Sequence, residues 1–162
     1  MTQANPYTPP TAAVADVAAD SNAPVTRRQL IPLWIKIFGW IFIVMGAVIP
    51  LLAVVAVAMG QPASYEIFGL QYRGSPFHPM ALFICALILS LAVSAYGLLF
   101  GKSWGLNACL ATGYGGVAIC LGTMVYALTQ GQFTLRLELL VHAPYLIKLH
   151  KIRPLWPSAP AR

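Results

Sequence analysis

Charged side chains are scarce in this chain. Of its 162 residues, 9% are charged and 59% are hydrophobic. A soluble domain of ordinary composition carries about 25% charged residues. So large a deficit leaves too little polar surface to cover a globule of this size. The apolar residues also fall in long uninterrupted blocks, which is typical of membrane proteins. The composition therefore argues against a soluble domain and predicts one small integral membrane domain.

Acidic residues are the scarcest charged type. The chain contains four, and two of them, Asp16 and Asp20, lie in the polar N-terminal segment. Little is left for general acid–base catalysis. The sequence also lacks a nucleophile elbow, a phosphate-binding loop, an H-E-x-x-H zinc motif and a dinucleotide fingerprint. We therefore predict that the protein is not an enzyme.

Cysteines are few, and they show no metal-binding or secreted-disulfide spacing. Cys109 and Cys120 would lie about 16 Å apart along one helix, which is too far for a disulfide. A disulfide between Cys85 and Cys120 on neighbouring helices stays open, and burial as small apolar residues is the alternative. The histidines are expected at three different depths of the membrane. We therefore predict no metal and no cofactor.

What the chain does contain is four apolar runs, at 33–59, 80–100, 104–128 and 133–150. The first three are long enough to cross a hydrocarbon layer of about 30 Å as helices. The fourth is short and holds Arg136, Pro144 and Lys148. A helix lying on the membrane surface is the alternative for it, but its polar residues scatter around the helix axis. The runs predict an all-α membrane protein, a four-transmembrane-helix bundle.

The ends of the chain and the first loop differ in composition from the runs. Residues 1–28 are predicted to form a disordered cytoplasmic tail and residues 157–162 a disordered C-terminal tail, flanking a transmembrane domain at 29–156. In the first loop, β-compatible residues at 64–68 and 70–73 flank Gly69. This pattern predicts a short β-hairpin in the first external loop.

The net charge of +6 comes from ten basic residues placed at the ends of the apolar runs. They form no dense basic stripe, so we expect no nucleic acid as a partner. With four spans and both termini in the cytoplasm, eight basic residues lie inside and two, Arg73 and Arg136, lie outside. This distribution follows the positive-inside rule and predicts a multi-pass, N-in/C-in topology.

Small residues recur at helical spacing in the first three runs. The positions are Gly39, Gly46 and Ala53, then Ala86, Ser90 and Ser94, then Ala108, Thr112 and Gly116. Such positions let helix backbones approach closely in a membrane. A glycine-lined pore is the alternative for the third run. Besides the lipid bilayer, the expected partner is a second copy of the chain or another membrane protein, and association of helices is the leading predicted function.

One group of polar residues in the fourth run suggests a site. Glu138, His142 and Tyr145 are spaced to share one helix face. Ionisable groups inside a membrane are costly and often functional. They suggest a small transporter or channel component that uses this face. The alternative is a satisfied pair near the headgroups that holds the helix end.

Two short motifs carry a resemblance. Asn5-Pro6-Tyr7-Thr8-Pro9-Pro10 resembles the N-P-Y-x-P-P opening of uncharacterised small four-span bacterial inner-membrane proteins. The segment from Gly97 to Trp104 is similar to the G-L-L-x-(G)-K/R-x-W turn between their middle helices. The resemblance implies a location in the bacterial inner membrane, which is the plasma membrane, and four spans. It implies no substrate and no catalytic residue.

Overall fold

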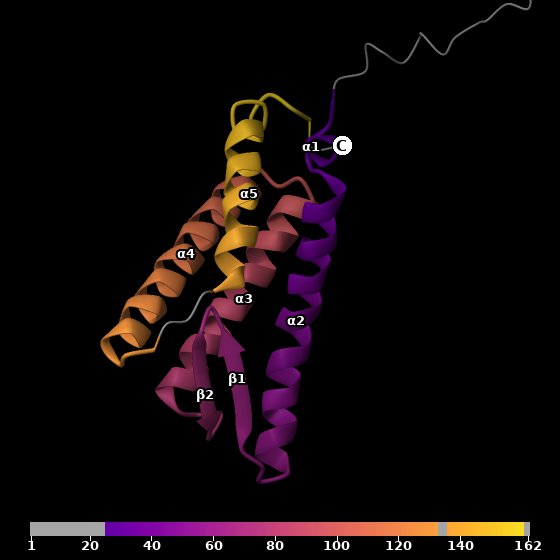
Figure 1. Cartoon of the computed structure of the whole chain (residues 1–162). Helices are drawn as coiled ribbons and strands as arrows, with labels where there is room; N and C mark the ends of the chain where they lie inside the picture. Colours follow the sequence, from indigo (N-terminus) through magenta and orange to yellow (C-terminus); the bar gives the residue numbers. More distant parts are fainter. Residues whose placement is uncertain (1–24, 133–135, 161–162) are drawn as a thin grey trace, which may run out of the picture.

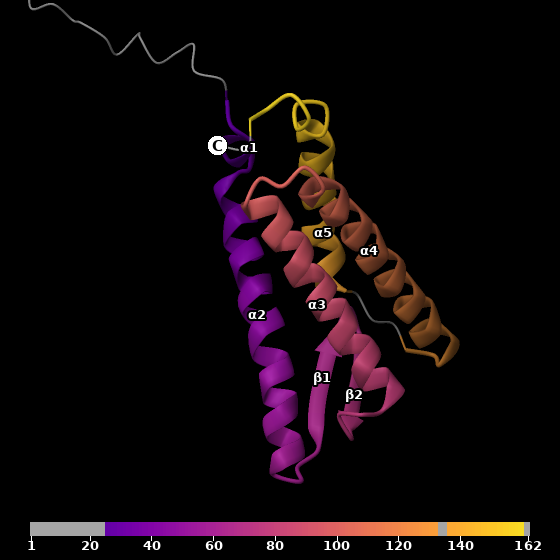
Figure 2. The same ribbon diagram turned by 180° about the vertical axis from the view of Figure 1, so that it is seen from behind.

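The structure is a computed structural model that describes residues 25–132 and 136–160. Its elements follow in the order α1 (Arg27–Leu30), α2 (Leu33–Ala58), β1 (Ala63–Ile67), β2 (Leu70–Gly74), α3 (Pro79–Leu99), α4 (Gly105–Thr129) and α5 (Leu137–Ile152). The long helices α2, α3 and α4 run side by side, with α5 packed along α4 (Figure 1). The hairpin lies at the end of the bundle away from α1, as the reverse view also shows (Figure 2).

Within the described residues, three helices, α2, α3 and α4, are long and apolar enough to cross a membrane. They match the predicted runs at 33–59, 80–100 and 104–128 to within one residue at each end. Large apolar side chains such as Val44 and Leu51 face outward from α2. Length, composition and outward apolar faces together indicate a membrane protein.

The fourth predicted run differs from the helix that forms. The helix α5 begins at Leu137 and has 16 residues, or about 24 Å of length. It is not among the helices long enough to cross a membrane by length and composition. Residues 133–135, with which the predicted run begins, lie outside the described residues.

The turn between α3 and α4 depends on glycine. Gly101, two residues after the end of α3, has a positive φ of 66°, a conformation that favours glycine. The Lys102 N–H donates to the Gly97 carbonyl at 2.9 Å and so closes the turn. Directly below, α3 and α4 meet at Gly97 and Gly105. A Cβ at Gly105 would lie 2.5 Å from the backbone nitrogen of Leu98, so only glycine permits this approach.

The predicted hairpin is present in the loop between α2 and α3. Strands β1 and β2 pair antiparallel, with Tyr65 opposite Tyr72. Gly69 at the tip has a φ of 80°. Tyr65 is buried in a cluster with Ala81 and Ile84 of α3, so the hairpin is anchored to the helices. This packing gives the hairpin the support that two isolated strands lack.

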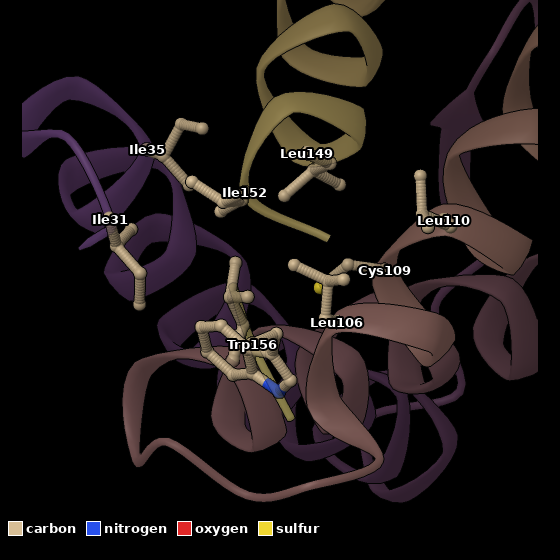
Figure 3. Close-up of a cluster of buried hydrophobic side chains, with 9 residues drawn as sticks. Ile31, Ile35, Leu106, Cys109, Leu110, Leu149, Ile152 and Trp156 are labelled. Atoms are coloured by element: carbon tan, nitrogen blue, oxygen red, sulfur yellow. The ribbon is translucent and has the colours of Figure 1, made fainter. Parts of the chain in front are cut away.

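A second cluster of buried side chains closes the opposite end of the bundle (Figure 3). It joins the start of α2, the turn region of α3 and α4, and the end of α5. Its members include Ile31, Ile35, Leu106, Leu149 and Trp156. Segments far apart in the chain thus share one core.

Hydrogen bonds tie both ends of the described chain to the α3–α4 turn. The Arg27 side chain donates to the carbonyls of Trp156 at 2.9 Å and Gly101 at 3.0 Å. The Trp156 indole donates to the Lys102 carbonyl at 3.2 Å. The Arg27 N–H donates to the Pro160 carbonyl at 3.0 Å. Among residues 157–160, which were expected in a disordered tail, Ala159 is buried and Pro160 accepts this hydrogen bond. Residues 1–24 and 161–162 lie outside the described residues.

Candidate functional site

The predicted polar face of α5 lines a cavity. Glu138, His142 and Tyr145 all contribute to the wall of one space of about 400 Å³. The other walls come from α2, α3, α4 and the hairpin. The three residues that the helical spacing placed on one face are thus brought together at one site.

The cavity lies where the helices leave a gap. Helix α2 packs on α3, and α5 packs on α4. Between α2 and α5, Trp34 meets Tyr145 edge to face at 6.4 Å between ring centroids. On the hairpin side, the Phe68 ring meets His142 in the same way at 5.4 Å. Aromatic contacts therefore join the walls near both ends of the cavity.

His142 is held in one orientation. Its Nδ1 lies 2.8 Å from the backbone carbonyl oxygen of Glu138. A carbonyl oxygen only accepts, so Nδ1 carries the proton, and in the neutral ring Nε2 is an acceptor. Gly116 of α4 makes room for this ring, because a Cβ there would lie 3.0 Å from Nε2 and 2.8 Å from Phe68.

Three more polar side chains on the cavity wall donate hydrogen bonds to helix carbonyls. The Ser94 hydroxyl donates to the Ser90 carbonyl at 2.7 Å, and the Thr112 hydroxyl donates to the Ala108 carbonyl at 2.9 Å. The Cys109 thiol donates to the Ser94 carbonyl at 3.2 Å. What these groups retain is acceptor capacity.

Charge on the wall has one sign. Glu66 and Glu138 both line the cavity, and no lysine or arginine of the described residues does. Gln71 donates to the Glu66 carboxylate at 2.7 Å. The nearby Arg136 donates instead to the Gly69 carbonyl at the hairpin tip, at 3.5 Å. Sequence reasoning missed Glu66, because only the folding of the hairpin onto the helices brings it to α5.

The predicted packing residues are largely used within the chain. Gly39 lies against Leu99, and Gly46 lies against Ala92. Ala53 packs on the cluster around Tyr65. The Ser90 hydroxyl donates to the Leu87 carbonyl of its own helix. Ala86 differs from the expectation, because it is exposed on the outside of α3.

The three histidines lie in separate surroundings. His78 stacks on Tyr72 at 4.6 Å and accepts from the Met80 N–H at the start of α3. His150 lies 2.6 Å from the Tyr114 hydroxyl. Within the described residues, no three His, Cys, Asp or Glu side chains gather as a metal site requires. The three cysteines are free thiols, including Cys85 and Cys120.

Comparisons of the chain with models of known protein families, with curated proteins and with solved structures give no match.

Proposed function

We propose that this protein is a non-enzymatic, multi-pass membrane protein that binds a small, largely apolar molecule in the cavity, as a carrier or as a component of a transporter. The observation that carries the proposal is the cavity itself. Its volume of about 400 Å³ falls in the range of small-molecule sites. Such sites have mostly apolar walls with a few convergent polar groups. Here Trp34 and Phe38 represent the apolar part, and Glu138 and His142 the polar part.

The proposed topology has four membrane segments, with α5 as the fourth, and both termini in the cytoplasm. Seven of the nine basic residues in the described part of the chain lie toward the end where α1, the α3–α4 turn and the end of α5 meet. They are Arg27, Arg28, Lys36, Lys102, Lys148, Lys151 and Arg153. The other two, Arg73 and Arg136, lie in or beside the hairpin. The positive-inside rule makes the first end cytoplasmic. A bacterial inner membrane is the proposed location.

The short α5 is compatible with a place in this bundle. Leu137, Leu140 and Ile147 are exposed apolar side chains of α5, and its exposed polar residues, His150 and Lys151, lie in the last turn. Its start meets the hairpin tip, where Phe68 contacts His142. In this arrangement α5 packs along α4, and the hairpin packs on α3 (Figure 1).

Photolabelling tests binding in the cavity. The protein, in nanodiscs of zwitterionic lipid, is irradiated with a long-chain alcohol that carries a diazirine, and labelled peptides are located by mass spectrometry. Val141 lies on the cavity rim and is 44% exposed, so Val141→Trp places an indole across the opening. Its neighbour Leu140 is exposed and does not line the cavity, so Leu140→Trp is the matched control.

We expect wild-type labelling to concentrate on cavity peptides of α2 and α5. Val141→Trp should reduce it several-fold, and Leu140→Trp should not. Labels spread evenly over the outward apolar faces, equal in all three proteins, would contradict the proposal.

Association with another copy or with a partner is the second candidate function, and one observation favours it. Small residues form an exposed stripe on α4, made of Ala111, Gly115, Ala118 and Gly122. A Cβ at Gly115 or at Gly122 would meet nothing within 4 Å. Small residues on one exposed face permit close approach of a second helix. Energy transfer between labelled copies in vesicles tests this. Gly115→Leu should lower the energy transfer, and Val44→Leu at an exposed position of α2 should not. Wild-type copies that show no transfer would contradict self-association.

A further inference from the structure

The polar wall of the cavity defines the chemical class of its ligand. We infer that the cavity selects an amphipathic amine, a cation with an apolar body whose ammonium N–H groups meet Glu138 and His142. This inference rests on the proposed function, because it names the ligand of the same site. It follows from the sign of the charge, from the hydrogen-bond capacity of the wall and from the aromatic rings around it.

The charged residues of the cavity wall are acidic, which favours a cationic ligand. Glu66 and Glu138 are the two acidic side chains among the described residues, and both line this one cavity. None of the described basic side chains lines it, although they outnumber the acidic ones by nine to two. The guanidinium of Arg136, the basic group nearest to Glu138 along the chain, turns to the Gly69 carbonyl. The wall therefore favours a positive ligand over a neutral or negative one.

The polar side chains named below leave hydrogen-bond acceptors on the cavity wall. The donors of Ser94, Thr112 and Cys109 are committed to helix carbonyls, and the Nδ1 proton of His142 is committed to the Glu138 carbonyl. What remains at these positions is lone pairs. A ligand that brings only acceptors would leave them unpaired, whereas an ammonium group brings donors and no acceptor.

Aromatic rings on the cavity wall also favour an organic cation. The cavity is lined by the rings of Trp34, Phe38, Phe42, Phe68 and Tyr145. Ring faces attract organic cations, and the attraction grows when water is excluded. The same rings give an apolar body a surface to pack on. An alkyl or aryl amine satisfies both demands, because its charge and its apolar body belong to one molecule.

Competition against the labelled alcohol tests the inference. In zwitterionic nanodiscs, unlabelled dodecylamine, dodecanol and dodecanoate compete with the diazirine alcohol for the cavity peptides. They share one apolar chain and differ in charge and donors. The amine should compete at least about tenfold better than dodecanol, as a charge-assisted hydrogen bond implies. Dodecanoate should be the weakest of the three.

The variant Glu138→Gln removes the charge and keeps the shape. It should reduce the advantage of the amine several-fold and leave competition by dodecanol unchanged. The matched control is Arg73→Gln, which changes a charge on the hairpin outside the cavity wall. The wild-type comparison of the three compounds decides the inference even if Glu138→Gln does not fold.

Equal competition by amine and alcohol, with the label still in the cavity, would overturn the cation selectivity and leave the proposed function standing. An alcohol that never labels the cavity, with an amine that does not bind there, would overturn both. Preference for dodecanoate would overturn the argument from charge.

Discussion

The contact of α3 with α4 at Gly97 and Gly105 predicts a clear difference between two alanine substitutions in α4. At Gly105, an added Cβ would meet the backbone of Gly97 and the Leu98 nitrogen of α3. At Gly115, ten residues further along α4, an added Cβ would meet nothing within 4 Å. Gly105→Ala and Gly115→Ala therefore make the same chemical change in two different surroundings.

The expected change in stability depends on which atoms an added Cβ would displace. The Cβ at Gly105 would approach the Leu98 nitrogen to 2.5 Å, and backbone atoms cannot rotate away as a side chain can. Overpacking of this kind costs about 1–3 kcal/mol. Gly105 is the first residue of α4, so the gain in helix propensity on changing it to alanine is small. At Gly115, inside the helix, that gain is up to about 1 kcal/mol and nothing opposes it.

The free energy of unfolding in mixed detergent micelles, followed by circular dichroism, measures both changes. We expect Gly105→Ala to lower it by about 1–3 kcal/mol and Gly115→Ala to leave it unchanged or raise it. Equal stability of the two variants would contradict this prediction, because it would mean that α3 and α4 do not meet at Gly97 and Gly105.

Two further predictions concern the ends of the bundle. Arg27→Gln removes the hydrogen bonds from the guanidinium to the carbonyls of Trp156 and Gly101. It should therefore lower the free energy of unfolding by about 1–3 kcal/mol. The control, Arg28→Gln, loses an exposed contact with the Phe100 ring that is worth under about 1 kcal/mol. Equal losses of stability in the two variants would contradict the role of Arg27. Tyr65 is buried, and its hydroxyl has no hydrogen-bond partner among the described residues. Burial, and to a lesser extent the Cys85 thiol, raises the pKa of this phenol above its ordinary value of 10.0. The folded state favours the neutral phenol of Tyr65, so the free energy of unfolding of the wild type should fall above pH 10.0 relative to that of Tyr65→Phe. The same pH dependence of unfolding in both proteins would contradict this.

Much of the architecture is encoded locally and was predictable for that reason. The length of each apolar run determines whether a helix can cross the membrane, so α2, α3 and α4 follow from the sequence alone. Gly69 between two β-compatible runs and Gly101 after α3 are local turn signals, and both adopt positive φ. The shared face of Glu138, His142 and Tyr145 follows from helical spacing.

The rest depends on which elements meet, and one sequence does not contain that information in its local patterns. Small residues were predicted as contact points, but the pattern does not say which partner they face. Gly46 meets Ala92 of α3, whereas Ala86, on the same helix as Ala92, faces outward. Glu66 joins the cavity only because the hairpin folds back along the bundle. The Pro160 carbonyl accepts a hydrogen bond from the Arg27 N–H, more than a hundred residues away in the chain.

In the proposed complex, the cavity holds an amine by its charged end at Glu138. Intermolecular nuclear Overhauser effects between dodecylamine and the isotope-labelled protein in nanodiscs test this placement. We expect contacts from the methylene beside the nitrogen to the side chains of Glu138 and His142, and from the alkyl chain to Ile35 and Leu98, which also line the cavity. Contacts confined to outward side chains of α2, such as Val44 and Leu51, would contradict it.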